Sequence, residues 1–206
     1  MKLYDFPRSS ASYRVRIACN LKGLEPERIF INFRENAQRS GAYLAVNPAG
    51  LLPALVTETG ESLGQSLAIL RYLDHLAPEP ALFPSDPMAE ARVLESCLTI
   101  ACDIHPLNNL RVLQHLKGEY GLDQAAVDDW YRHWVRTGFI TLEALAGRYA
   151  EGYCAGDELS AADICLVPQM FNARRFDVPL DDFPTLVAID ARMQEIEAVR
   201  AAAPEA

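Results

Sequence analysis

A proline-rich stretch in the middle of the chain most constrains how this protein can fold. Four of the ten residues from Pro78 to Pro87 are prolines. Proline fixes φ and lacks a backbone donor, so this stretch can continue neither a strand nor a long helix. A chain of 206 residues is long enough for two small domains, each with its own core. We predict a first domain over 1–79, a linker over 80–86 and a second domain over 87–206.

Residues before the linker mix the hydrophobic periods of strands and helices. The predicted order is βαβ, a short irregular helix and then ββα, which is a small α/β layer architecture. We expect helices at about 12–23, 40–46 and 65–77, and strands at Lys2–Tyr4, Arg28–Ile31, Ala54–Thr57 and Glu61–Leu63. In the first helix, Tyr13, Ile17, Leu21 and Leu24 are predicted to share one apolar face.

Residues beyond the linker carry apolar side chains at helical spacing only. One such pattern covers 87–116 and another covers 123–150, where Trp130 and Trp134 lie on an apolar stripe. Tryptophans in this position favour a packed core over a cofactor site. We therefore predict an all-α second domain.

Composition excludes several classes of function. The net charge of −9 argues against a nucleic-acid-binding surface, which needs a basic field. We find neither an apolar run of about 18 residues nor a signal peptide, so we expect no membrane partner. The five cysteines form no CxxC pair, which predicts no metal site and a reducing cytoplasm. Four of them lie in apolar helical patterns and are expected to be buried: Cys19, Cys97, Cys102 and Cys165.

A serine-rich turn precedes the first predicted helix. Ser9, Ser10 and Ser12 follow Pro7 at the point where the helical pattern begins. The unpaired N–H groups of a first helical turn, and the helix dipole, favour negative charge there. The turn therefore suits a carboxylate, a phosphate or a thiolate, although a serine at this position can also do no more than cap the helix.

Two further features follow in the same domain. Asn47–Leu55 places a turn with Pro53 at the mouth of a strand. A cis bond there would leave the Leu52 backbone able to pair with an extended ligand, whereas a plain hairpin turn is the alternative. Ser66 opens the next helix and can bind a carboxylate. Two such helix N-termini, with this turn between them in sequence, indicate a peptide-like ligand with a carboxylate.

Several segments together resemble the zeta class of glutathione transferases. Residues 9–18 match the class signature serine-serine-cysteine-serine-x-arginine-valine-arginine-isoleucine-alanine, except that Ala11 replaces the cysteine. The resemblance continues in Asn47–Leu55, Gln65–Ile69, Asp103–Leu113 and Gly156–Asp163. It spans nearly the whole chain and implies a thioredoxin-like first domain followed by an all-α second domain.

The resemblance implies that glutathione is the cofactor. Ser9, with Ser10 beside it, would act on the sulfur and lower the pKa of the thiol. The remaining glutathione-binding residues would be Leu52 and Pro53 at the cysteinyl group, Gln65 and Ser66 at the γ-glutamyl end, and Gln38 and Asn108 at the glycyl end. Ala11 leaves the site without a protein thiol, which argues against disulfide exchange but leaves chemistry at the glutathione thiol intact.

A cationic set completes the site that the resemblance implies. Arg8, Arg111 and Arg175 would bind substrate carboxylates, since an arginine can hold each carboxylate through two hydrogen bonds. His105 would bind substrate and stabilise an enolate or move a proton. Salt bridges and helix C-terminal charge are the alternative for any one of these residues, and for Arg174 in particular. Ser160 and Asp163 form a capping box, which we assign to stability.

These features predict a glutathione-dependent cis–trans isomerase of a small anionic maleyl diketo acid, either maleylacetoacetate or maleylpyruvate, in aromatic catabolism. The thiolate of glutathione would add to the cis double bond, which could then rotate before glutathione leaves. The family also implies a cytoplasmic homodimer. The alternatives are a general glutathione transferase acting on small electrophiles such as α-halo acids and a non-catalytic glutathione-binding scaffold.

Overall fold

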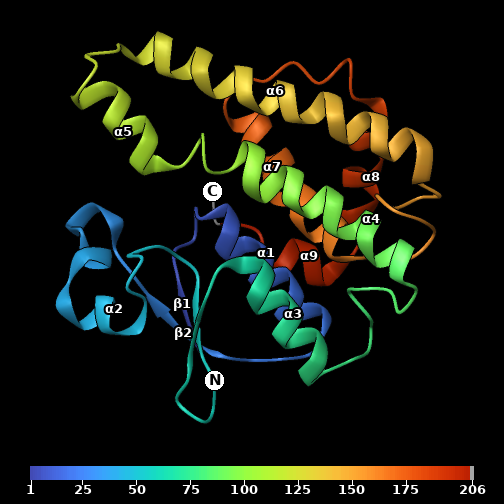
Figure 1. The fold of residues 1–206 in the computed structure, drawn as a ribbon, viewed down its shortest axis with the longest axis horizontal. Coiled ribbons are helices and arrows are strands. Elements are labelled where there is room, and N and C mark those ends of the chain that lie inside the picture. The colour runs from blue at the N-terminus through green and yellow to red at the C-terminus, as the bar shows by residue number, and fades with distance from the viewer. Residues whose placement is uncertain (205–206) are drawn as a thin grey trace. The chain divides into compact units, whose positions relative to one another are not determined.

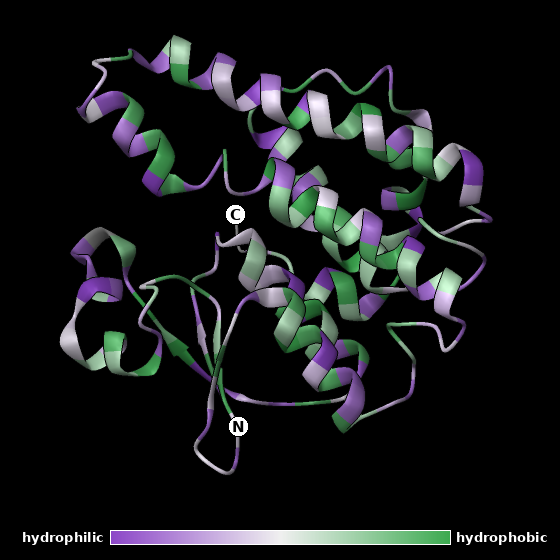
Figure 2. Cartoon of the chain, viewed as in Figure 1, coloured by the Kyte–Doolittle hydropathy of each residue, from purple (hydrophilic) through white to green (hydrophobic). Residues whose placement is uncertain are grey.

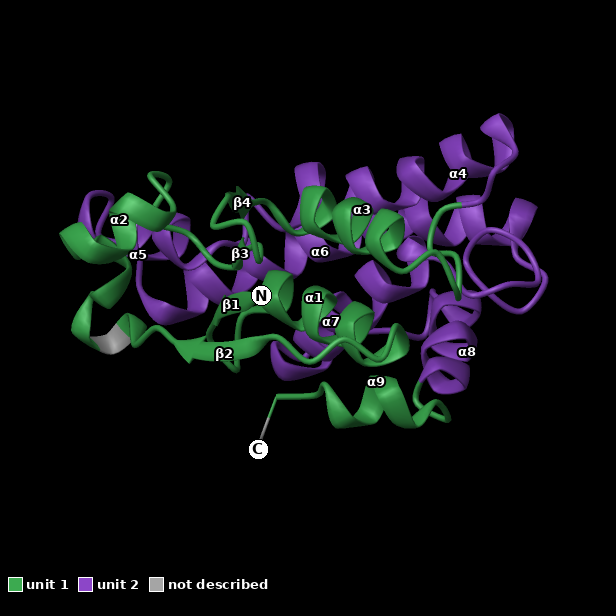
Figure 3. Ribbon diagram, turned by 90° about the horizontal axis from the view of Figure 1, so that it is seen from below, with its two compact units in different colours: residues 1–83, 194–206 green, residues 84–193 purple. Residues whose placement is uncertain are grey.

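The computed structural model describes residues 1–204 and divides into two compact units. Unit 1 combines Met1–Phe83 with the C-terminal segment that begins at Gln194, and unit 2 is Pro84–Met193 (Figure 3). The boundary near Phe83 falls inside the predicted linker. The C-terminal segment differs from the prediction, because it belongs to the first unit and not to the helical one. The reason is that α9 (Glu197–Ala201) packs on the first helix of unit 1.

Unit 1 is built on a four-stranded sheet with the order β2-β1-β3-β4. Strand β1 is parallel to β2 and antiparallel to β3, and β3 is antiparallel to β4. The elements before α9 are β1 (Lys2–Asp5), α1 (Ser10–Leu21), β2 (Glu27–Phe30), η1 (Phe33–Glu35), η2 (Ala37–Arg39), α2 (Gly41–Val46), β3 (Ala54–Val56), β4 (Ser62–Gly64) and α3 (Ser66–Leu76). The predicted α/β first domain is confirmed.

Side chains alternate across this sheet and so divide its core between two faces. Tyr4 and Ala54 lie opposite each other in the register and join a cluster with Tyr43 of α2. Leu3 and Leu55, the next opposed pair, are buried on the other face, where α1 and α3 lie (Figure 1). Because side chains in a strand alternate with period two, each strand serves both layers.

Helix α1 is more deeply buried than its sequence pattern indicates. Every residue from Ser10 to Cys19 is buried, whereas one apolar face was predicted. The reason is that α9 covers α1 in addition to the elements expected around it. The Arg16 Nε donates to the Ala202 carbonyl at 2.9 Å, and the Asn20 amide donates to the Ala198 carbonyl at 2.9 Å. These bonds fix the end of the described chain to the first helix.

Unit 2 is helical, and hydrophobic residues recur among hydrophilic ones along its long helix α6 (Figure 2). Its helical segments are α4 (Pro87–Leu98), the π-helical η3 (Thr99–Ile104), α5 (Leu110–Gly118), α6 (Gln124–Tyr149), α7 (Ala161–Arg175) and α8 (Pro184–Met193). The predicted all-α second domain is confirmed. The single helix predicted over 87–116 is wrong: α4 passes into η3, and a turn at 105–109 separates η3 from α5. Pro106 lacks a donor for a continuous helix, and Asn109 caps the new one.

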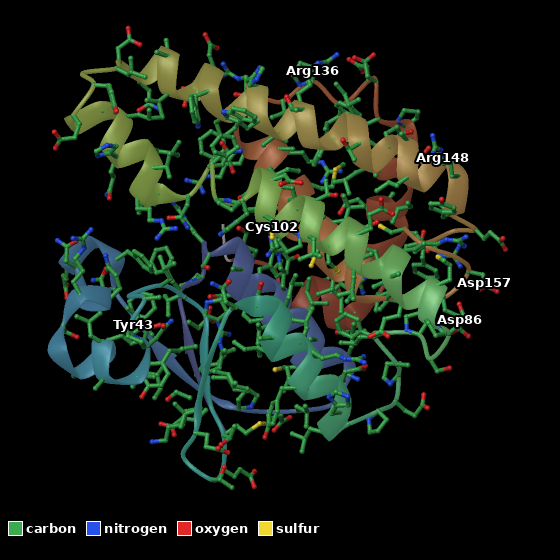
Figure 4. The ribbon with its side chains drawn as sticks, in the orientation of Figure 1. Tyr43, Asp86, Cys102, Arg136, Arg148 and Asp157 are labelled. Atoms are coloured by element: carbon green, nitrogen blue, oxygen red, sulfur yellow. The ribbon has the colours of Figure 1, made fainter. Side chains whose placement is uncertain are left out.

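Unit 2 contains three features on which the sequence made predictions: the capping box at Ser160, the role of Arg174 and the burial of Cys102. Ser160 and Asp163 form the predicted capping box at the start of α7. Burial raises the pKa of the Asp163 carboxyl, against hydrogen bonds that lower it. Arg174 pairs with buried Asp190 at 2.6 Å, so its role is structural. Cys102, labelled in Figure 4, is exposed, contrary to the prediction, whereas Ile100 and Ile104 on either side of it are buried. No helix in residues 1–204 is long and apolar enough to cross a membrane.

Candidate active site

Ser9 is the N-cap of α1 and holds the serine-rich turn in place. Its backbone is extended, with φ −76° and ψ 114°, and its Oγ accepts a hydrogen bond from the Ser12 N–H at 3.2 Å. The Ser9 hydroxyl therefore does cap the helix. Capping uses an oxygen lone pair and leaves the hydroxyl proton to be donated elsewhere. Capping and ligand binding are thus compatible at the same serine.

The other residues of the turn differ in exposure. Arg8 is exposed directly before the helix, whereas Ser10 and Ala11 are buried within its first turn. No acidic residue lies in the first turn of α1. The N-terminus of α1 therefore keeps its positive electrostatic character, which stabilises a nearby anion.

The turn before β3 is ordered around the Leu51 carbonyl. This oxygen accepts hydrogen bonds from the Tyr43 hydroxyl at 2.5 Å and from the Asn47 amide at 2.7 Å. Burial raises the pKa of Tyr43 to about 12. The Leu52–Pro53 bond is cis, which is the first of the two alternatives predicted for this turn. Within the described chain, the Leu52 N–H and carbonyl make no backbone hydrogen bond.

Gln38 lies against this same turn. Gly50 has φ +61°, and a Cβ built on it would lie 3.2 Å from the Gln38 carbonyl oxygen. Only glycine combines this backbone angle with so close an approach. The Gln38 side chain is buried, and its Oε1 has no hydrogen-bond partner in the part of the chain described. Gln38 therefore lies against the turn at Gly50, with an amide group able to bind a ligand.

Gln65 and Ser66 form the start of α3. Gln65 is exposed and has φ +64°, a conformation that costs a non-glycine residue about 1–3 kcal/mol. Ser66 is buried, and its Oγ accepts from the Arg14 Nη1 at 3.1 Å. A Cβ on Gly64, directly before Gln65, would lie 3.6 Å from the Asn47 side chain. Unit 1 thus links the start of α3 to α1 on one side and to the Leu52 turn on the other.

Sequence reasoning missed three residues that organise this part of the site: Arg14, Tyr43 and Asn47. Tyr43 and Asn47 shape the Leu52 turn, and Arg14 holds Ser66. Arg14 is recognised only in the structure, through its burial and its contact with Ser66. Tyr43 and Asn47 act through long-range and turn hydrogen bonds that no periodicity predicts.

Unit 2 places its predicted site residues on separate elements. His105 follows η3, its N–H donating to the Ile100 carbonyl at 2.9 Å. Asn108 lies in the turn, and Arg111 is exposed in the first turn of α5. The turn therefore separates His105 from Arg111, and the two residues do not lie on one continuous helix. The turn is anchored by Trp130, whose Nε1 donates to the Leu107 carbonyl at 2.9 Å.

Tyr131 of α6 connects Asn108 with Arg175. The Asn108 amide nitrogen donates to the Tyr131 carbonyl at 3.4 Å, and the Asn108 Oδ1 is buried with no partner among the described residues. The Tyr131 ring stacks on Phe176 with centroids 3.7 Å apart. The exposed Arg175 places its guanidinium 5.2 Å from the Phe176 ring centroid. Burial raises the pKa of Tyr131, and the charge of Arg175 opposes this effect.

The site residues therefore fall into two sets with different chemistry. Unit 1 carries the set suited to a thiolate and a peptide-like ligand: Arg8, Ser9, Ser10, Gln38, Leu52, Pro53, Gln65 and Ser66. Unit 2 carries the set with positive charge and hydrogen-bonding groups: His105, Asn108, Arg111 and Arg175. Residues 1–204 contain no group of acidic, histidine or cysteine side chains that could hold a metal ion.

Two family models match the chain. The glutathione S-transferase N-terminal domain matches residues 8–76, and the glutathione S-transferase C-terminal domain matches residues 140–197. A probable maleylacetoacetate isomerase of Vibrio cholerae is 44% identical over 206 residues, covering 98% of this chain and 95% of the relative.

Solved structures with the same fold agree with these matches. A holo maleylpyruvate isomerase, described as a bacterial zeta-class glutathione S-transferase, is 41% identical with a TM-score of 0.95, covering 99% of this chain and 97% of its own. Maleylacetoacetate isomerase of Methylobacterium extorquens AM1, with bound malonate and glutathione, is 37% identical with a TM-score of 0.95. The match covers 99% of this chain and 96% of that protein's chain. The chain therefore belongs to the glutathione S-transferase family, in the zeta class that includes these isomerases.

Proposed function

We propose that this protein is a glutathione-dependent cis–trans isomerase of a maleyl diketo acid, maleylacetoacetate or maleylpyruvate. Its relatives carry these two activities in their names. The observation that carries the proposal is Ser9, a hydroxyl at the N-terminus of a buried helix with no acidic residue in its first turn. Such a position stabilises a thiolate, which is the species that this isomerisation needs.

The residues present in unit 1 fit glutathione. The Leu52 backbone groups make no hydrogen bond within the described chain and suit the cysteinyl group of an extended tripeptide. Gln65 and Ser66 at the N-terminus of α3 suit the γ-glutamyl end, and the unpartnered Gln38 Oε1 marks a further polar position. Asn108 suits the glycyl end less directly, because its amide nitrogen already donates to Tyr131.

Glutathione, when bound, supplies a thiolate that adds reversibly to the cis double bond and so permits rotation about it. Ser9 directs its hydroxyl proton toward the sulfur, and the dipole of α1 favours the ionised form. Ser10 lies beside Ser9, in the first turn of α1. Ala11 contributes no thiol, so the protein offers no sulfur of its own in this turn.

The arginines bind the two carboxylates of the substrate. Arg8, Arg111 and Arg175 are exposed, and none of them makes an ion pair within residues 1–204. Arg174, by contrast, is occupied by Asp190. His105 hydrogen-bonds the ketone oxygen, where negative charge develops, or moves a proton to the adjacent carbon. In this proposal three of the substrate-binding residues come from the helical unit: His105, Arg111 and Arg175.

We infer a homodimer with two-fold symmetry, the commonest form of oligomer, working in the cytoplasm in the breakdown of aromatic compounds. The cysteines are free in the structure, which agrees with a reducing compartment. Size-exclusion chromatography with light scattering measures the mass, and a monomer at micromolar concentration would contradict the dimer.

Absorbance loss of maleylpyruvate and of maleylacetoacetate, with and without glutathione, tests the function. We expect turnover only with glutathione, and the faster substrate names the activity. Arg111→Ala and Arg175→Ala should each lower kcat/KM about 10- to 100-fold, since each removes a charged hydrogen bond to a carboxylate. Arg148→Ala is the matched control, an exposed arginine near the end of α6 (Figure 4). Turnover of α-halo acids alone would contradict the proposal and favour a general transferase.

A further inference from the structure

Arg14 is a buried cation for which the described residues provide no counter-charge. Its side chain is 1% exposed. The Nη1 donates to the Ser66 Oγ at 3.1 Å, whereas Nε and Nη2 are buried without a hydrogen-bond partner in residues 1–204. A buried charge, and buried donors left unpaired, are costly to a folded protein unless something compensates them.

The other buried cations of residues 1–204, Arg16 and Lys22, are each paired with a carboxylate. Arg16, two residues along the same helix, donates to Asp5 at 2.7 Å and to the carbonyls of Pro7 and Ala202, both at 2.9 Å. Lys22 donates to Asp74 at 2.9 Å and to two backbone carbonyls. Arg14 therefore differs from the buried cations whose role is to hold the fold together.

The surroundings of Arg14 add positive electrostatic character. Its guanidinium contacts the first residue of α3, an 11-residue helix whose N-terminus carries the positive end of the helix dipole. A cation at this end of a helix is unfavourable, so the arrangement combines two positive groups with no negative one. An anion bound at the N-terminus of α3 would compensate both.

We propose that Arg14 is a positioning residue for the γ-glutamyl α-carboxylate of glutathione. Its Nη1 occupies a lone pair of the Ser66 oxygen, so that the Ser66 proton is directed to the carboxylate, and its charge stabilises that anion. The inference rests on the proposed glutathione site and adds to it the residue that supplies the counter-charge. Polarisation along the Arg14–Ser66 pair also makes the hydroxyl a stronger donor.

The test compares glutathione with γ-aminobutyryl-cysteinylglycine, which lacks only this carboxylate. Isothermal titration calorimetry measures both affinities for wild type, Arg14→Gln and the charge-conserving Arg14→Lys. Wild type should bind glutathione at least about tenfold more tightly than the analogue, because a hydrogen-bonded carboxylate is lost. Arg14→Gln should remove most of this preference by weakening glutathione alone, and Arg14→Lys should keep part of it.

Thermal unfolding of the unliganded variants separates this role from a structural one. Removing an unpaired buried charge should not lower the Tm of unliganded Arg14→Gln, whereas the rise in Tm caused by glutathione should shrink. An unliganded Arg14→Gln that is unfolded, or an equal loss of affinity for both ligands, would overturn the inference. If the wild type binds neither ligand, the proposed glutathione site is overturned as well. If the wild type prefers glutathione and Arg14→Gln keeps the same preference, only the role of Arg14 is overturned.

Discussion

At the scale of single residues, Ser9 has a structural and a chemical task that a substitution can separate. Ser9→Ala should lower the free energy of unfolding by about 1 kcal/mol, because the N-cap bond to the Ser12 N–H is lost. It should also raise the pKa of the bound glutathione thiol, measured by thiolate absorbance near 240 nm during a pH titration. Ser9→Thr keeps the hydroxyl and is the control. An unchanged thiol pKa in Ser9→Ala would contradict the role of Ser9.

Cysteine reactivity provides a second test at this scale. Burial raises the pKa of Cys19 to about 12, so at pH 8 this thiol remains protonated and unreactive. Burial likewise raises the pKa of the Cys154 thiol, whereas Cys102 is exposed. Iodoacetamide at pH 8 should therefore label Cys102 first, as peptide mass spectrometry would show. Labelling in Cys102→Ser should be slow, and rapid labelling of Cys19 there would contradict the described burial.

At the scale of elements, the contact between α6 and the π-helical η3 depends on one glycine. A Cβ on Gly138 would lie 2.2 Å from the Ile104 Cγ1. Gly138→Ala should therefore cost about 1–3 kcal/mol of stability through overpacking. It should also lower isomerase activity, because η3 leads directly into His105. Chemical denaturation measures the first effect.

Gly147 is the matched control on the same helix. No atom lies within 4 Å of a Cβ built there, so Gly147→Ala should gain about 0.5–1 kcal/mol from helix propensity. Equal effects of the two substitutions would show that helix propensity, and not the contact with Ile104, dominates at position 138.

At the scale of the whole molecule, unit 1 is completed by a segment from the other end of the chain. Truncation after Met193 removes Val199 and Ala202, both buried, and the carbonyl that accepts from Arg16. We expect the Tm to fall by at least about 5 °C, because several kcal/mol of packing and hydrogen bonding are lost. Ala203→Ser, an exposed change in the same segment, should leave the Tm unaltered. A truncated chain with wild-type Tm would contradict the packing of α9 on α1.

Local patterns in the sequence predicted most elements of both units. Strand alternation, serine and proline signals, and the capping box at Ser160 act over a few residues, so their physics can be recognised without the fold. The zeta-class resemblance was confirmed by the family matches. The roles assigned to individual site residues remain predictions for the experiments above.

Features that depend on distant contacts were not predictable in the same way. The attachment of α9 to unit 1 and the burial of α1 on nearly all sides follow from tertiary packing. Arg14 shows the same limit, because its missing counter-charge is visible only once Ser66 lies beside it. Cys102 is exposed between the buried residues Ile100 and Ile104, and the apolar character of the segment alone did not predict this.

In the proposed reaction, glutathione is regenerated while a cis double bond becomes trans. Proton NMR on one reaction can follow the maleyl substrate, the fumaryl product and free glutathione together, with glutathione at a tenth of the substrate concentration. We predict that the substrate converts completely to the fumaryl isomer while free glutathione stays constant. Conversion that stops after one equivalent of glutathione, with a stable conjugate in place of the fumaryl product, would contradict the isomerase.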